Sequence, residues 1–351
     1  MDNIDNEYIE NAIDDLIPVV GLKEPIPHLN MCNTIKHGQV EEAIKLIAEY
    51  LGLPITVNLS YGGFESDDLV VTDKSGKGVA GITAQVSIPS YLPVYGSAQL
   101  QGFPISIKAS ENCKEYPETF IMLIAHELCH ILLHSIGYKQ SNNEIYTDLA
   151  AMVLGFDVVM RFGRIVDHVK EGFISTETTR VTYGYLSDSQ FDFAYTKIDG
   201  IRYKIIDLEK EVIKKIKSHK KRLSLYSREV LRFRKLVEYL DGHRNKEIQK
   251  DDARKIVLFH QFDYIDEYAK EITVNEEKLK EVDDWFIGGI SSSHKMIDSL
   301  KELDGNLDSL ISIIDNKFRA LRKDTNIIDK YVGFSDKHKL NKQVKLLAKE
   351  E

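Results

Sequence analysis

The stretch that decides the fold of this chain is AHELCHILLH, residues 125–134. It forms the centre of an apolar segment that opens at Pro117, a residue typical of the first helical turn. The segment stops at Gly137, and glycine is favoured just after the end of a helix. We therefore expect a buried helix over about residues 117–136.

Two histidines in this helix share one face. His126, Glu127 and His130 form the pattern His-Glu-x-x-His, and positions four apart lie about one turn from each other. Both imidazoles can therefore reach one ion, for which Zn²⁺ is the expected metal. Glu127 is turned by about 100° from His126, so it can stand beside the metal and accept a proton from metal-bound water.

A second helix is expected to supply the third ligand, because a catalytic zinc needs three protein ligands and one open position. It should begin after a polar, helix-capping stretch and run over about residues 144–162. We assign Glu144 as the third ligand, and Asp148 as the acceptor for the free N–H of a ligand imidazole, that of His126. Two alternatives stay open: Asp148 as ligand with Glu144 outside, or Glu144 as a simple partner of the helix dipole.

Other residues around the pattern have competing interpretations. His134 lies about 12 Å along the helix axis from His126, too far to share its ion, and is expected to pack or hydrogen-bond. Cys129 is expected to be a small filler, with a redox or metal-inhibiting role as the alternative. A hydrolytic site also needs a hydrogen-bond donor for a developing oxyanion. Four downstream candidates are His168, Arg180, Tyr183 and Tyr185.

Strand-like runs precede the helices. ITVNLS at 55–60, GITAQVSIP at 81–89 and FPISIKAS at 103–110 have the alternation of half-buried strands. We expect a small, mostly antiparallel sheet, a polar loop over 61–78 and an earlier helix over 39–52. The run ITAQVSI is either an ordinary strand or an edge strand that pairs with an extended substrate.

The C-terminal part has a different composition. From about residue 205 the chain consists of long periodic segments rich in Lys, Glu, Leu and Ile, which predict a helical bundle or hairpin. Residues 1–200 carry 13 Lys and Arg against 27 Asp and Glu, whereas 201–351 carry 33 against 28. The halves are thus −14 and +5, which together give the net −9. We expect two domains, over 1–200 and 205–351.

The stretch Lys210–Lys235 holds 11 Lys and Arg against two acids. We interpret it as a solvated helix face rather than a nucleic-acid surface, because no aromatic-basic motif accompanies it. A protein partner that binds through these C-terminal helices is the alternative use of the region.

Several features favour a cytoplasmic protein without a membrane segment. The N-terminus is acidic where a secretory signal would be basic, and the most apolar segment, Phe120–Ile136, carries ionisable residues. Three scattered cysteines form no disulfide framework and no Cys-x-x-Cys pair, so we expect reduced thiols.

With these motifs in view, the chain resembles the ImmA/IrrE-type bacterial zinc metalloproteases. That family has a similar His-Glu-Leu-small-His, a following Leu-Leu-His run and then Glu-x-x-Ala-Asn-x-x-Ala-Ala, comparable to AHELCHILLH and EIYTDLAAMVLG here. The resemblance covers roughly residues 30–200, and GYLSD at 184–188 is similar to a late segment of such domains. Cys129 and Asp148 depart from the family pattern, as does the missing proline after VLGF.

The resemblance implies an α+β, zincin-like metallopeptidase domain of the gluzincin type, followed by an all-α domain. It further implies zinc-dependent hydrolysis of peptide bonds in a specific protein substrate, with Glu127 as general base. The competing class is a non-catalytic zinc-containing scaffold or regulator that acts through the C-terminal helices.

Overall fold

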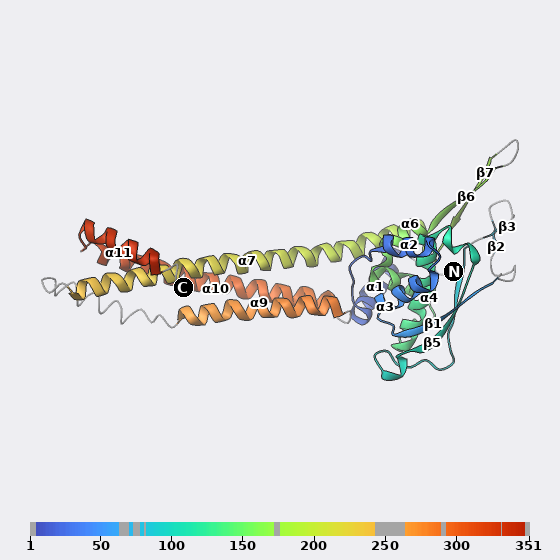
Figure 1. The fold of residues 1–351 in the computed structure, drawn as a ribbon, viewed down its shortest axis with the longest axis horizontal. Coiled ribbons are helices and arrows are strands. Elements are labelled where there is room, and N and C mark those ends of the chain that lie inside the picture. Colours follow the sequence, from blue (N-terminus) through green and yellow to red (C-terminus); the bar gives the residue numbers. More distant parts are fainter. Residues whose placement is uncertain are drawn as a thin grey trace. The chain divides into compact units, whose positions relative to one another are not determined.

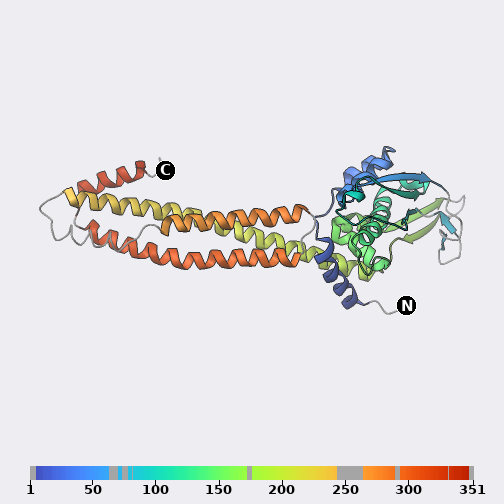
Figure 2. The same cartoon turned by 90° about the horizontal axis from the view of Figure 1, so that it is seen from below.

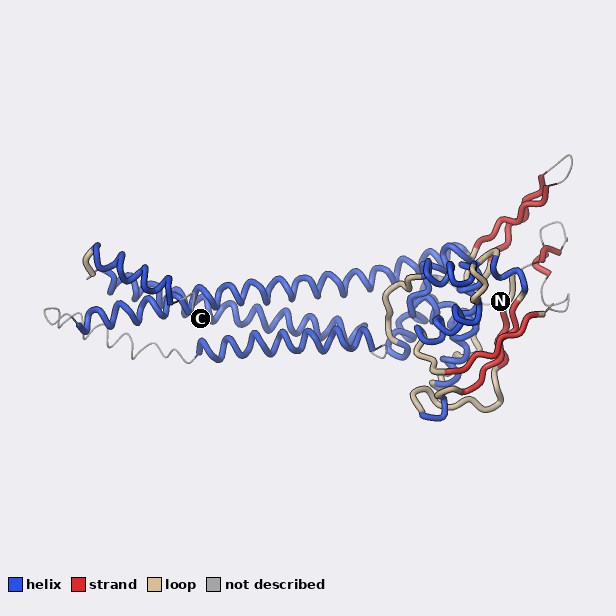
Figure 3. Tube along the Cα trace, viewed as in Figure 1, coloured by secondary structure: helices blue, strands red, loops and turns tan. Residues whose placement is uncertain are grey.

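The computed structural model describes residues 5–62, 70–72, 78–80, 82–171, 176–242, 264–288, 293–330 and 332–347. The chain divides into two compact units: Met1–Tyr203 with Trp285–Lys295, and Lys204–Asp284 with Met296–Glu351. Among the described residues, the first unit mixes helices and strands and the second is helical (Figure 3). The expected mixed α+β fold with a long all-helical C-terminal region is confirmed in this coarse form. None of the described helices is long and apolar enough to cross a membrane.

Four helices build the core of the first unit: α1 (Asn6–Val20), α2 (His28–Lys36), α3 (Val40–Tyr50) and α4 (Pro117–Ser135). Helix α1 is capped at its N-terminus by Asp5, whose carboxylate accepts the Tyr8 N–H at 2.9 Å. Its buried residues recur at helical spacing, which explains why this acidic segment folds against the core: Ile9, Ala12, Ile13, Leu16, Ile17 and Val20. Helices α3 and α4 match the two helices expected from the apolar periodicity.

A three-stranded sheet has the order β1 (Ile55–Tyr61), β5 (Phe103–Ala109), β4 (Ala84–Ser87). Strand β5 is parallel to β1 and antiparallel to β4, so the expectation of a mostly antiparallel sheet is wrong. The connection from β1 to β5 is long enough for a parallel crossover. Strand β5 is the central strand, between β1 and β4. Helix α3 contacts β1 and helix α4 contacts β4, so the helices cover one side of the sheet (Figure 1).

Two further pairs of strands form antiparallel ribbons. Strand β2 (Val70–Thr72) lies within the stretch 61–78 that was expected to be a loop, and it pairs with β3 (Gly78–Ala80), which begins at the last residue of that stretch. Most of the other residues of the stretch lie outside the described part. Strands β6 (Ile165–Glu171) and β7 (Thr176–Thr182) pair just after the helical segment that ends at Gly163. Neither ribbon was expected from the sequence.

The helix expected over 144–162 is interrupted. The chain forms α5 (Glu144–Ala151), a π-helical turn (Met152–Phe156) and α6 (Asp157–Gly163). Gly155 has φ +95°, and a Cβ there would lie 2.3 Å from the Glu24 carbonyl oxygen. The Ile26 N–H donates to the Gly155 carbonyl at 2.9 Å, so an incoming segment of chain passes closely over this break. A glycine is needed because only it combines this φ with this approach.

A buried ion pair holds the same break in place. Arg202, on helix α7 (Asp188–Gly242), donates to both carboxylate oxygens of Asp157 at 2.7 and 3.0 Å. The same guanidinium donates to the carbonyls of Met152 and Lys23. Because Arg202 and Asp157 are 3% and 1% exposed, water cannot replace either partner.

Substituting Arg202 by Met is expected to lower the free energy of unfolding by about 3–5 kcal/mol, since it leaves a buried carboxylate without a partner. Thermal or urea unfolding of the full chain measures this loss. Lys197, on the same helix as Arg202, forms a more exposed ion pair with Glu10 of α1. Lys197→Ala should lower the free energy of unfolding by at most about 1 kcal/mol. Equal effects of the two substitutions would contradict the role given to Arg202.

The second unit comprises the later part of α7 with α9 (Tyr264–Gly288), α10 (Ser293–Asp329) and α11 (Phe334–Leu347). Two views agree that α9 and α10 lie along α7 (Figures 1 and 2). The buried residues of α9 follow one another at steps of four and three, as in a coiled coil: Tyr268, Ile272, Asn275, Leu279 and Val282. This heptad repeat explains the extended helical packing.

Much of the basic stretch Lys210–Lys235 is engaged inside this unit. Lys215 pairs with Asp304 and Asp308 of α10, and Lys220 pairs with Glu276 of α9. Arg222 and Arg232 also pair with acids of α10, Asp315 and Asp329. These cations thus connect α7 to its neighbours, as charged residues beside a coiled-coil seam commonly do.

Candidate metal centre

Three side chains from two helices converge. The His126 Nε2 lies 3.0 Å and the His130 Nε2 3.2 Å from the Glu144 Oε2. One ligand atom from each residue can be chosen so that all lie within 4.8 Å of one another. Both imidazoles are buried and Glu144 is partly exposed, so the group has a protein side and a solvent side. This cluster could hold a metal ion.

The outer nitrogen of each imidazole has its own partner. The His126 Nδ1 lies 2.7 Å from the Asp148 Oδ1, and the His130 Nδ1 lies 3.1 Å from the Ser141 carbonyl oxygen. An ionised carboxylate and a carbonyl can only accept, so both Nδ1 atoms donate, and with neutral rings both Nε2 lone pairs face the cluster. Asp148 thus lies behind His126 and is not one of the three converging side chains.

The start of α5 places Glu144 and Asp148. The Asn143 side chain caps this helix by accepting the N–H groups of Ile145 and Tyr146 at 3.0 and 3.4 Å. Its own amide donates to the Tyr8 hydroxyl at 3.1 Å, which ties the cap to α1. Glu144 is therefore the first residue of the helix, and Asp148 follows one turn later on the same side.

Glu127 is beside the cluster and outside it. Its Oε2 accepts the Val86 N–H of strand β4 at 2.9 Å. Burial raises the pKa of Glu127, and the Val86 hydrogen bond and the two imidazoles partly offset this rise. A carboxylate with an upward-shifted pKa is better matched to accepting a proton near neutral pH than an ordinary one.

The carboxylates around His126 hold a proton on it when no metal is bound. Burial by itself lowers the pKa of His126, but the hydrogen bonds to Asp148 and Glu144 outweigh burial and raise it to about 10. Below that pH the ring is protonated, and a metal must displace the proton because only the neutral ring is a ligand.

Binding of Zn²⁺ at pH 7.5 is therefore expected to release about one proton per site, and metal affinity should rise with pH through the neutral range. Calorimetric titration in two buffers with different enthalpies of ionisation counts the released protons. Identical heats in both buffers would contradict the assignment of a protonated His126 in the metal-free protein.

The four candidate oxyanion donors differ in their surroundings. The Tyr183 hydroxyl is buried and accepts the Ile82 N–H at 3.0 Å. Arg180 pairs with Asp167 across the β6–β7 ribbon. The side chain of His168 lies outside the described part of the structure. Only Tyr185, among the three described candidates, contacts the cluster: its ring stacks on that of His126 with centroids 5.4 Å apart.

Two further residues predicted near the site have structural surroundings. The His134 Nε2 lies 3.1 Å from the Asn142 Oδ1, and His134 is not in the ligand group. Cys129 is fully buried, and this burial raises the pKa of its thiol. A thiol that stays protonated is neither a good nucleophile nor a metal ligand, so Cys129 fits the filler role.

The backbone supplies contacts that the sequence does not reveal. The Val86 N–H and the Ser141 carbonyl each fix a site residue, yet every residue has these groups. Thr147 adds a side-chain contact to the His130 Nδ1 at 3.3 Å.

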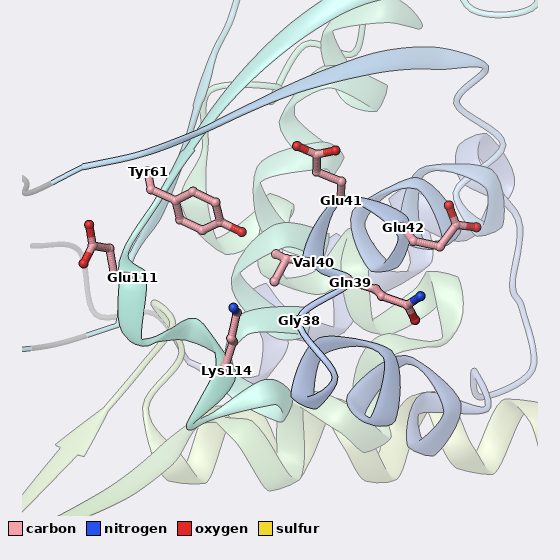
Figure 4. Close-up of a pocket in the computed structure, with 8 residues that line it drawn as sticks. All are labelled: Gly38, Gln39, Val40, Glu41, Glu42, Tyr61, Glu111 and Lys114. Atoms are coloured by element: carbon pink, nitrogen blue, oxygen red, sulfur yellow. The ribbon is translucent and has the colours of Figure 1, made fainter.

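A separate hollow of about 1090 Å³ lies between the start of α3, the end of β1 and the turn before α4 (Figure 4). The Tyr61 ring and the Lys114 side chain point into it from different elements. Its lining also includes the acids Glu41, Glu42 and Glu111. None of the three converging side chains lines this hollow, so it is distinct from the candidate metal centre.

Comparison with known proteins identifies no relative: no protein-family model matches the chain, and no curated protein or solved structure is significantly similar to it. Functional inference for this chain therefore depends on the chemistry of the cluster itself. That chemistry comprises two imidazoles, one carboxylate that meets them and a second carboxylate, Glu127, beside them.

Proposed function

We propose that the first unit is a zinc-dependent metallopeptidase with a zincin-like site. The carrying observation is that the Nε2 atoms of His126 and His130 converge on the Glu144 carboxylate while Glu127 stands next to them, outside the ligand group. Three protein ligands with a solvent side are what a catalytic zinc site requires. The resemblance of AHELCHILLH and EIYTDLAAMVLG to ImmA/IrrE-type proteases supports the same proposal.

The choice of metal and reaction depends on Glu127. Two histidines and one carboxylate suit Zn²⁺, and the same set with open positions also suits Fe(II) in oxygenases. A carboxylate base beside the ligands, with its pKa raised by burial, has a use in hydrolysis, where water must lose a proton. The neighbouring base therefore favours a hydrolytic zinc site.

The metal, Glu127 and Asp148 have different roles in the proposed hydrolysis. Bound zinc would polarise the scissile carbonyl and lower the pKa of water. Glu127 accepts a proton from the attacking water and delivers it to the leaving amine. Asp148, behind His126, holds that imidazole in the tautomer that directs Nε2 to the site.

Strand β4 provides a place for an extended substrate. It lies at the edge of the sheet, and the Val86 N–H faces away from β5, toward Glu127. In the part of the chain that the structure describes, no strand pairs with this edge. A peptide that adds to β4 by backbone hydrogen bonds would pass beside the base, a common mode of peptide recognition.

The substrate class we infer is a specific protein, with the helical second unit as a second contact surface. A scaffold role is the competing proposal: a non-catalytic metal site with function carried by the C-terminal helices. The two proposals differ in whether Glu127 is needed for the function.

The test combines metal analysis with a cleavage assay. Purified protein is expected to contain zinc and to generate new termini in a proteome-derived peptide library read by mass spectrometry. Removal of the metal by a chelator should stop cleavage, and added Zn²⁺ should restore it. Zinc-loaded protein without cleavage of peptides or of folded partner proteins would support the scaffold role.

A further inference from the structure

The segment between β7 and α7 lies against the candidate metal centre. The Tyr185 N–H donates to the Asp148 Oδ2 at 2.7 Å, and the other oxygen of that carboxylate accepts from His126. The Tyr185 ring is nearly parallel to the His126 ring, at 22°. Because Tyr185 is 58% exposed while His126 is buried, the tyrosine covers the ligand imidazole from the solvent side.

The backbone around Tyr185 is held from three directions. Gly184 has φ +90°, and a Cβ there would lie 3.0 Å from the Met122 Cε and 3.2 Å from the Asp148 Oδ2. Arg164 donates to the Leu186 carbonyl at 2.8 Å, and its own carbonyl accepts the Tyr183 N–H at 2.7 Å. The position of Tyr185 is thus set by packed neighbours, although its side chain reaches solvent.

The surroundings of the Tyr185 hydroxyl are acidic. Tyr185 interacts electrostatically with the carboxylates of Glu144, Asp148 and Glu127. Of these three, Glu144 is a proposed ligand and Glu127 is the proposed base. A phenol hydroxyl can donate a hydrogen bond. The Tyr183 hydroxyl already accepts the Ile82 N–H, whereas among the described residues no hydrogen bond engages the Tyr185 hydroxyl.

We propose that Tyr185 is a catalytic residue of this site, whose hydroxyl donates a hydrogen bond to the oxyanion that forms on the scissile carbonyl. This inference rests on the proposed peptidase function and goes beyond it by selecting one donor. The selection follows from contact with His126, exposure to solvent and a fixed backbone, which the other described candidates do not combine.

The proposed hydrolysis begins with the attack of water on the scissile carbonyl. The oxygen of water bonds to the carbonyl carbon, the water proton passes to Glu127, and the electron pair of the C=O double bond moves to the carbonyl oxygen. Tyr185 stabilises the resulting negative charge without losing its own proton. The C=O bond then re-forms, the C–N bond breaks, and Glu127 returns the proton to the leaving amine.

The test uses the full-length chain loaded with Co²⁺, whose visible spectrum reports the ligand group, and acetohydroxamate as a probe. The probe chelates a metal through two oxygens that resemble those of a hydrated peptide carbonyl. Tyr185→Phe removes only the hydroxyl. Tyr203→Phe is the matched control, since Tyr203 is 61% exposed on α7 and is not in the site.

Tyr185→Phe is expected to bind Co²⁺ with an unchanged spectrum and affinity, but to bind acetohydroxamate about 10-fold more weakly, as for the loss of one hydrogen bond to a charged group. Tyr203→Phe should match the wild type in both. Unchanged hydroxamate affinity in Tyr185→Phe would overturn the proposal. Loss of Co²⁺ would also overturn it, in favour of a purely packing role for the ring.

The same experiment separates this proposal from the one on which it rests. Wild-type protein that takes up no Co²⁺ would overturn the metal centre, and Tyr185 with it. Wild-type protein that binds Co²⁺ and acetohydroxamate, beside a Tyr185→Phe variant that behaves identically, would overturn the role of Tyr185 alone.

Discussion

Replacing His130 by alanine is expected to empty the metal site, whereas replacing His134, one turn further along α4, should leave metal content unchanged. The His130 Nε2 is one of the three converging ligand atoms, while the His134 ring is hydrogen-bonded to Asn142. Loss of an outer-shell partner already costs about 10- to 100-fold in metal affinity, and loss of a ligand should cost more. Metal content after dialysis against limiting Zn²⁺ measures the difference.

The His134→Ala variant is a matched control for His130→Ala. Both substitutions remove an imidazole from the same helix, so their effects on helix propensity are matched. Circular dichroism and thermal unfolding without metal verify that both variants fold. A His130→Ala variant that retains zinc as the wild type does would show that the converging side chains are not a metal centre.

Replacing Glu127 by glutamine is expected to abolish cleavage while zinc stays bound. Glutamine has the size of glutamate and its carbonyl oxygen can still accept the Val86 N–H, so the local structure should persist. It cannot take up a proton, and general base catalysis typically contributes about 10²–10⁴-fold to a rate. The fall in the rate of new-terminus formation in the peptide library measures this contribution.

A second substitution shows whether the effect is local. Glu115, an exposed residue just before α4, lies outside the ligand group, and Glu115→Gln should cleave and bind zinc like the wild type. Full activity in Glu127→Gln with zinc bound would exclude Glu127 as the base. If the biological role of the chain also survived that substitution, the scaffold proposal would replace the enzymatic one.

The two helices that carry the candidate ligands could be predicted because their signals are local. In α4, the apolar run, the initial proline and the i, i+4 histidines are all properties of one continuous segment. The cap at Asn143 likewise positions Glu144 and Asp148 through contacts within a few residues. Such features depend on helix geometry, which is the same wherever the helix lies.

The sheet and the break after α5 could not be predicted in the same way. Whether β5 is parallel or antiparallel to β1 depends on the path of the connection between them. The alternation of apolar and polar residues within a strand carries no information about that path. From the sequence alone, Gly155 is compatible with one continuous helix. Its φ of +95° accompanies a close approach by the Glu24 carbonyl, and Glu24 is far away in the sequence. Local sequence therefore gives no signal for the break.

The sequence by itself determined the kinds of candidate ligand, their spacing along α4 and α5, and the presence of a further carboxylate, Glu127, next to them. Only the tertiary structure decided that α5 brings Glu144 to both imidazoles, that an edge strand holds Glu127, and that Tyr185 rather than Tyr183 faces the site. The reason is physical: spacing within a helix is a property of the backbone. Distances between elements depend on how their side chains pack, and that packing involves residues from the whole unit.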